Sequence, residues 1–167
     1  MIVLGIDPGL ATTGYGILSG TESHMKPLGF GSIITPSDWA ISRRLQAIYQ
    51  QVLGIIEQYQ PSEIAVEELF FSRNVTTALV VGQARGVILL AAQQKNLTLM
   101  EYKPMEVKLA VTGYGRAEKK QVQQMVKILL GLAEVPKPDD TADALAIAIC
   151  HMQSRKLKSL EIMNRGC

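Results

Sequence analysis

The stretch that decides the fold is IVLGIDPGLATTGYG, at residues 2–16. Its first five residues are apolar and lead into Asp7, after which Pro8-Gly9 is a strong turn signal. Two further short apolar runs, at residues 15–18 and 30–34, are bounded by glycines. Runs of this length between turn residues are typical of β-strands. We therefore predict that the chain opens with three strands in an antiparallel meander.

Downstream of the meander, helical and strand-like segments alternate. An apolar stripe over residues 41–56 predicts a helix that starts at Pro36 and Ser37 and ends before Pro61. We predict strands at residues 64–66 and 97–102, and further helices at residues 74–94, 104–111, 118–130 and 140–155. Strands joined by helices pair in parallel through right-handed crossovers. The prediction is an α/β fold with a mixed five-stranded sheet and helices on both faces: one domain over residues 1–156, then a frayed tail at 157–167.

Bulk composition sets limits on function and location. The 167 residues carry a formal charge of only +2, so any nucleic-acid surface must concentrate its positive charge on one face. Cys150 and Cys167 form no CxxC pair, which fits a reducing cytoplasm. The start lacks the pattern of a signal peptide, and no uninterrupted apolar stretch reaches the ~20 residues that span a bilayer. We expect a soluble cytoplasmic protein without a membrane partner, in which His24 and His151 are surface or packing residues.

Four carboxylates lie where strand ends and a helix start should converge. Asp7 ends the first strand and Glu67 the fourth, and ligands of α/β sheets bind in the crevice at such ends. Asp140 and Asp143 are three residues apart at the start of the last helix, so they share a face. For that pair alone, helix capping is the simpler interpretation, and for any single acid a surface turn is.

A cluster of these acids would need cations. Neighbouring carboxylates repel one another and raise one another's pKa, and divalent cations remove the repulsion. An all-oxygen set favours Mg²⁺, with Mn²⁺ as a substitute, over zinc. Two ions ~4 Å apart can activate a water and stabilise the leaving oxygen of a phosphodiester. The spacing alone therefore suggests metal-dependent hydrolysis.

Five ordered segments resemble the RuvC family of bacterial Holliday junction resolvases, which have a ribonuclease H-like fold. GIDPGLATTGYG (5–16) resembles the first family motif and AVEELFF (65–71) the second. VGQARG (81–86), VK (107–108) with AEK (117–119), and DTADALAIA (140–148) follow in family order. The similarity extends from residue 2 to about residue 152.

The resemblance implies a homodimeric endonuclease that nicks four-way DNA junctions symmetrically, leaving 5′-phosphate and 3′-hydroxyl ends, together with the RuvA–RuvB branch-migration complex. It makes Asp7, Glu67, Asp140 and Asp143 the catalytic metal ligands, with two ions in each site. Lys119 becomes a candidate for stabilising the charged transition state. Without the resemblance, Lys119 is more simply a solvated lysine at a helix start.

Basic and aromatic residues supply candidate DNA contacts. Phe70 and Phe71 follow Glu67 directly; we expect Phe70 to stack on or wedge between bases, with Arg73 beside it on a phosphate. Positive charge gathers between residues 103 and 127, at Lys103, Lys108, Arg116, Lys119, Lys120 and Lys127. Lys108, Arg116, Lys119 and Lys120 are the predicted phosphate contacts. Because Glu101, Glu106 and Glu118 dilute this patch, a mixed solvated surface is the alternative.

A homodimer has a physical rationale, since a two-fold dimer matches the approximate two-fold symmetry of a four-way junction. The helix at residues 74–94 is rich in apolar residues and carries Gly82 and Gly86, which permit close contact. Subunit contact and ordinary core burial explain this composition about equally well.

Three other functions compete with the resolvase. A nucleotide-binding protein of the actin and sugar-kinase type needs a second, duplicated domain, for which 167 residues leave no room. A related nuclease acting on RNA precursors shares part of the acid set, but Phe70, Phe71, Lys108 and Lys119 favour the junction enzyme. A non-catalytic junction-binding module is disfavoured because all four acids are present.

Overall fold

The centre of the molecule is one mixed five-stranded sheet. The computed structural model describes residues 1–68 and 75–165. The sheet has the order β3-β2-β1-β4-β5. β1 pairs antiparallel with β2 and β2 with β3, whereas β1, β4 and β5 run parallel. The strands are β1 (Ile2–Asp7), β2 (Thr12–Thr21), β3 (His24–Ile34), β4 (Glu63–Glu67) and β5 (Thr98–Tyr102). The predicted meander and parallel crossovers are confirmed.

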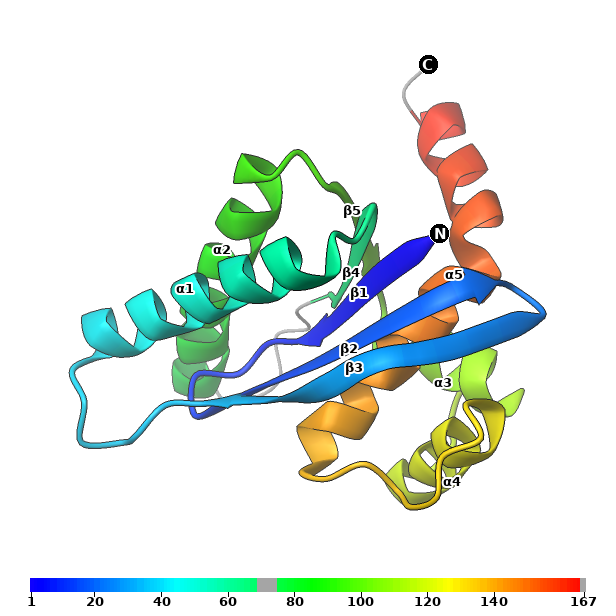
Figure 1. Ribbon diagram of the computed structural model, residues 1–167, viewed down its shortest axis with the longest axis horizontal. Helices are drawn as coiled ribbons and strands as arrows, with labels where there is room; N and C mark the ends of the chain where they lie inside the picture. Colours follow the sequence, from blue (N-terminus) through cyan, green and yellow to red (C-terminus); the bar gives the residue numbers. More distant parts are fainter. Residues whose placement is uncertain (69–74, 166–167) are drawn as a thin grey trace.

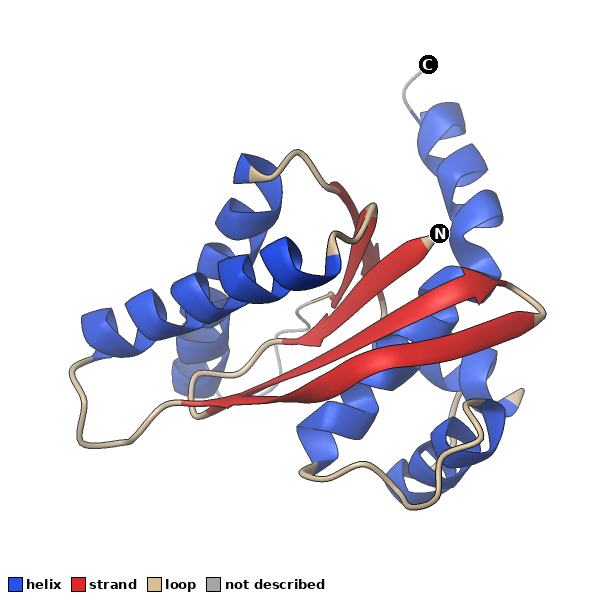
Figure 2. Cartoon of the chain, in the orientation of Figure 1, coloured by secondary structure: helices blue, strands red, loops and turns tan. Residues whose placement is uncertain are grey.

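Helices cover both faces of this sheet, as predicted. Figures 1 and 2 show α1 and α2 on one side and α3, α4 and α5 on the other. The helices are α1 (Ile41–Tyr59), α2 (Val75–Gln94), α3 (Pro104–Thr112), α4 (Lys119–Leu129) and α5 (Asp139–Arg165).

Strand alternation divides the interior into two cores. Successive side chains of a strand point to opposite faces. Leu4, Ile6 and Ile64 accordingly pack with α1 and α2, while Val3 and Ala65 pack with α3, α4 and α5. The same alternation directs the last residues of β1 and β4, Asp7 and Glu67, toward α5. These two residues are the strand-end acids.

The predicted start of the first helix is wrong. α1 begins at Ile41, not at Pro36 or Ser37. Residues 36–39 instead form a turn in which the Trp39 amide donates to the Pro36 carbonyl at 3.3 Å. The Trp39 ring carries the Arg43 guanidinium 3.9 Å from its centroid. Because this local turn occupies residues 36–39, the helix begins only after it.

The last helix is longer than expected. It continues to Arg165, past the end predicted near Arg155, so the segment expected to fray is helical as far as that residue. Ion pairs hold the added turns: Arg155 binds Glu63 at 2.6 Å and Lys158 binds Glu106 at 2.8 Å. Local periodicity does not reveal such distant partners. The domain boundary at residue 156 stays a prediction.

One face of α2 is apolar yet exposed. By length and composition alone, the segment Thr76–Gln94 is long and apolar enough to cross a membrane. Its apolar residues are interrupted by Gln83 and Arg85, so it contains no continuous apolar stretch of that length. Core helices of soluble proteins pass the same test, and Ala84, Ile88 and Ala91 are fully buried against the sheet. Leu79 and Leu90 are 63% and 51% exposed. The helix therefore has an inner face that packs on the sheet and an outer face that leaves Leu79 and Leu90 exposed among the described residues.

Candidate active site

The two strand-end acids lie side by side. β1 and β4 are paired in parallel register from Val3 with Glu63 to Ile6 with Val66, so Asp7 and Glu67 follow at neighbouring strand ends. Adjacent strands are about 4.8 Å apart. Both acids belong to the face that α5 covers, and both are partly buried. The sheet therefore presents a carboxylate pair toward the start of α5.

Glycines of the first strand pair bring the two α5 acids to this edge. A Cβ atom on Gly5 would lie 2.3 Å from the Ala144 carbonyl oxygen, and one on Gly14 would lie 1.9 Å from the Asp140 carbonyl oxygen. Only residues without a side chain let the helix backbone lie this close to the strands. The glycines of the opening motif thus place Asp140 and Asp143 next to Asp7.

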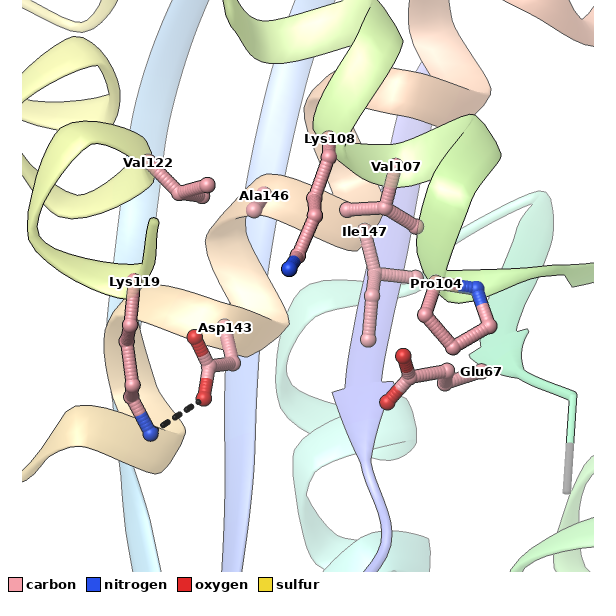
Figure 3. Close-up of a pocket in the computed structure, with 9 residues that line it drawn as sticks. All are labelled: Glu67, Pro104, Val107, Lys108, Lys119, Val122, Asp143, Ala146 and Ile147. Atoms are coloured by element: carbon pink, nitrogen blue, oxygen red, sulfur yellow. Dashed lines mark ion pairs between the residues drawn. The ribbon is translucent and has the colours of Figure 1, made fainter. Parts of the chain in front are cut away.

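A pocket of about 200 Å³ opens between these elements. Figure 3 shows the carboxylates of Glu67 and Asp143 on opposite sides of it, with Lys108 pointing into the space and Lys119 joined to Asp143. The Lys119 ammonium is 3.0 Å from Asp143 and 3.5 Å from Asp139. The pocket is lined by Glu67, Pro104, Val107, Lys108, Lys119, Val122, Asp143, Ala146 and Ile147.

Electrostatic coupling shows how closely the acids gather. Burial, and then the charges of Glu67, Asp143 and Asp140, raise the pKa of Asp7 to about 8, against a weaker lowering by Lys119. Burial and then Asp143 raise the pKa of Glu67, which Lys108 and Lys119 lower. The site therefore holds more negative charge than its two lysines neutralise.

The donor set fits a hard divalent cation. All four acids offer carboxylate oxygens, which Mg²⁺ and Mn²⁺ prefer. Within residues 1–68 and 75–165, however, no three Asp, Glu, His or Cys side chains already form a group that could hold one ion. Asp143 is engaged by Lys119. Glu67 and Asp143 line the pocket itself, and Asp7 and Asp140 are linked to them by their charges but are not part of its lining.

The predicted DNA contacts divide into three groups. Lys108 of α3 and Lys119 of α4 line the pocket. Arg116 and Lys120 are exposed close by along the chain, and Lys120 lines a second hollow beside Tyr114. Phe70, Phe71 and Arg73 lie outside the described residues.

Two of the acids expected to dilute the basic patch have cationic partners elsewhere. Glu101 forms an ion pair with Arg85 of α2, and Glu106 binds Lys158 of α5 at 2.8 Å. Since these carboxylates are neutralised within the protein, they oppose the positive charge of the patch less than the sequence suggests.

Sequence reasoning missed a buried polar network beneath the site. His151, expected to be a surface or packing residue, is fully buried and contacts both Tyr102 and Glu63. A signal was present: His151 lies eight residues after Asp143, and therefore on the same helix face.

Comparisons with known proteins agree with this architecture. The family model described as "Crossover junction endodeoxyribonuclease RuvC" matches residues 3–151. A relative of that name from Heliobacterium modesticaldum is 59% identical over 150 residues, which cover 90% of this chain and 93% of the relative. The relative from Rubrobacter xylanophilus is 52% identical and covers 95% and 88%.

Solved structures show the same similarity. The structure of Thermus thermophilus RuvC is 37% identical, with a TM-score of 0.86 over 94% of this chain and 96% of that one. The structure of T. thermophilus RuvC in complex with a Holliday junction substrate has a TM-score of 0.89 at the same identity and coverage.

Proposed function

This chain belongs to the RuvC family of crossover junction endodeoxyribonucleases and is a Holliday junction-resolving endonuclease of DNA recombination and repair; from that premise we propose that it cuts by Mg²⁺-dependent hydrolysis at the pocket between β1, β4 and α5. The observation that carries the proposal is the gathering of four carboxylates at a partly buried position, where burial and then the charges of Glu67, Asp143 and Asp140 raise the pKa of Asp7 to about 8. Such a concentration of negative charge needs divalent cations when all four acids are ionised.

Each acid has a role that its position supports. Asp7, Glu67, Asp140 and Asp143 would hold the metal. Asp7 lies at the strand end next to that of Glu67 and beside the start of α5. Bound Mg²⁺ would supply a water of lowered pKa and stabilisation of the leaving 3′-oxygen. The expected products are a 5′-phosphate and a 3′-hydroxyl, and Mn²⁺ is the expected substitute.

The pocket lysines would meet the phosphate. Lys108 points into the pocket and Lys119 borders it (Figure 3). Lys119 loses its attraction to Asp143 once that carboxylate is neutralised, and its ammonium is then available to the charged transition state. Arg116 and Lys120 extend the positive surface, and Phe70 with Arg73 complete the proposed contacts.

The exposed face of α2 supports a homodimer. Leu79, Gln83, Gly86 and Leu90 are all exposed and follow one another at intervals of four, three and four residues, which places them on one stripe. A Cβ atom on Gly86 would have no neighbour within 4 Å in the monomer. No packing against the described residues requires this glycine, so its lack of a side chain favours the close approach of a second helix.

A two-fold dimer also fits the substrate. It would place two identical pockets at symmetric positions on the four-way junction, which has the same approximate symmetry. The homodimer would work with the RuvA–RuvB complex in the cytoplasm, as the family resemblance implies.

The test is cleavage of a synthetic four-way junction compared with a linear duplex and a structured RNA of equal length. We expect paired incision of the junction alone, dependent on Mg²⁺, with 5′-phosphate ends on the products. Asp7→Asn should abolish cutting and leave junction binding largely intact, because it removes a metal ligand and no phosphate contact. Cutting that survives chelation of divalent ions, or that prefers the RNA, would contradict the proposal.

A further inference from the structure

A chain of buried hydrogen bonds ties α5 to the sheet at the end of β4 opposite Glu67. The His151 Nδ1 lies 2.9 Å from the Tyr102 hydroxyl, and its Nε2 lies 2.6 Å from the Glu63 carboxylate. Arg155, one turn further along α5, donates to both oxygens of Glu63 at 2.6 and 3.1 Å. His151 is fully buried. This network contacts none of the four acids of the pocket.

The chemistry of the network assigns its protons. Arg155 and, after it, His151 hold the pKa of Glu63 below its usual range, so this carboxylate only accepts hydrogen bonds. The His151 Nε2 therefore carries a proton and donates to Glu63. Burial lowers the pKa of His151, so the ring is neutral and its Nδ1 accepts from the Tyr102 hydroxyl. Each hydrogen-bonding group of the network has a partner.

The spacing of the network matches the spacing of the pocket acids. Glu63 and Glu67 are four residues apart on β4 and point to the same face, which separates them by about 13 Å. His151 and Asp143 are eight residues apart on one face of α5, which separates them by about 12 Å. The helix runs antiparallel to the strand. A contact between Glu63 and His151 therefore sets Asp143 opposite Glu67.

Close packing on the glycines sets how near α5 lies to the strands, but it separates positions one helical turn apart less sharply. Ala144 and Ala148 lie on Gly5, and Leu145 lies on Gly16. A slide of one helical turn, about 5.4 Å, would replace Ala144 on Gly5 by Ala148 and Leu145 on Gly16 by Ile149, again a small residue on Gly5 and an apolar one on Gly16. Directional buried hydrogen bonds do not tolerate such a slide, because each leaves an unsatisfied polar group.

We propose that Glu63 and His151 are positioning residues that hold α5 in register on β4, so that Asp143 faces Glu67 across the pocket. The inference rests on the proposed function, in which these acids hold the metal ion. A buried polar pair of this kind specifies one arrangement among several of similar packing.

The experiment measures Mn²⁺ binding to the full-length protein without DNA, by electron paramagnetic resonance titration, alongside single-turnover cleavage of a four-way junction in Mg²⁺. We expect His151→Phe to weaken Mn²⁺ binding about 10-fold and to slow cleavage about 100-fold, with junction affinity in chelator unchanged. His151→Gln, whose amide can still donate to Glu63, should retain most of both properties.

The matched control is Ile149→Val, which removes a buried methyl group from the same helix without touching the network. It should keep wild-type Mn²⁺ affinity. An equal loss in this control would overturn the inference, since any disturbance of α5 would then suffice. A folded His151→Phe protein with wild-type Mn²⁺ affinity would overturn it as well.

Glu63→Ala provides a second route if His151→Phe does not fold, because Glu63 lies at the start of a strand and is partly exposed. The same loss of Mn²⁺ affinity is expected, and wild-type affinity in this folded variant overturns the inference. When wild-type protein binds Mn²⁺ and every variant binds it equally, only the register inference fails. If the wild-type protein binds no Mn²⁺, the proposed metal site is wrong, and the inference that depends on it is wrong as well.

Discussion

At the scale of single residues, the charge around the pocket is unbalanced. Burial raises the pKa of Asp143, and its hydrogen bond to Lys119 lowers that pKa only in part. Lys119 is shared between Asp143 and Asp139, at 3.0 and 3.5 Å. Its ion pair with Asp143 places this ammonium beside the carboxylates of the pocket (Figure 3).

Replacement of Lys119 by alanine should slow cleavage far more than it weakens junction binding. A donor that acts on transition-state charge is worth about 10²–10³ in rate, whereas a single exposed lysine contributes little to total DNA affinity. Single-turnover cleavage and junction titration in chelator separate the two effects. Lys127→Ala, on the same helix but outside the pocket lining, is the control. An equal loss of binding and rate in Lys119→Ala would assign this lysine to DNA affinity alone.

At the scale of elements, the site depends on how closely α5 lies on the first two strands. Gly5, Gly14 and Gly16 stand at the contact, each with helix atoms where a Cβ would be. The motif that carries the first catalytic acid therefore also positions the last two. One short segment of sequence serves both chemistry and packing.

Gly5→Ala should consequently reduce both stability and cleavage. The added methyl meets the Ala144 carbonyl oxygen, and such overpacking costs about 1–3 kcal/mol. The displaced helix should also weaken metal binding. Urea denaturation and Mn²⁺ titration measure the two effects. Gly54→Ala in α1 is the control: a Cβ there meets no atom within 4 Å, so we expect up to about 1 kcal/mol of added stability from helix propensity. A Gly5→Ala protein as active as wild type would show that α5 can shift without harm.

The outer stripe of α2 makes a separate prediction about assembly. Leu79→Lys combined with Leu90→Lys should convert the proposed dimer to a monomer, because the two lysines of each subunit would be buried against their symmetry copies. Analytical ultracentrifugation measures the change. Ile128→Lys, at a similarly exposed position on α4, should remain dimeric. If the α2 double variant stays dimeric, the subunit interface lies elsewhere.

At the scale of the whole molecule, the buried acid cluster links stability to pH. The pKa of Asp7 is raised from 3.8 to about 8, so the folded protein binds a proton that the unfolded chain releases near pH 4. Stability without metal should therefore fall as the pH rises from about 4 to about 8, and level off above that.

Asp7→Asn should remove much of this dependence. The neutral amide has no charge to desolvate, so the variant should be more stable than wild type at pH 8, by on the order of a few kcal/mol, and similar to it at pH 4. Denaturation in chelator at both values measures the difference. Added Mg²⁺ should stabilise the wild type at pH 8 and affect Asp7→Asn much less. If the wild-type protein is equally stable in chelator at pH 4 and pH 8, the link between the raised pKa of Asp7 and the stability of the fold is wrong.

Local sequence patterns determined much of this protein. Apolar runs and turn residues predicted all five strands, the antiparallel meander and the parallel pairing of the later strands, because strand formation and parallel crossovers follow from periodicity and connection length. The spacing of Asp7, Glu67, Asp140 and Asp143 indicated metal-dependent hydrolysis, and the resemblance of five ordered segments to the RuvC family indicated a resolvase.

Only the tertiary structure decided how these parts meet. The burial of His151 and the ion pairs of Arg155 and Lys158 depend on partners more than 50 residues away along the chain. The contact of Gly5 with Ala144 and the exposure of Leu90 depend likewise on which faces the fold brings together. The physical reason is that hydrogen bonds, close packing and desolvation act between neighbours in space, and a sequence pattern records only neighbours along the chain.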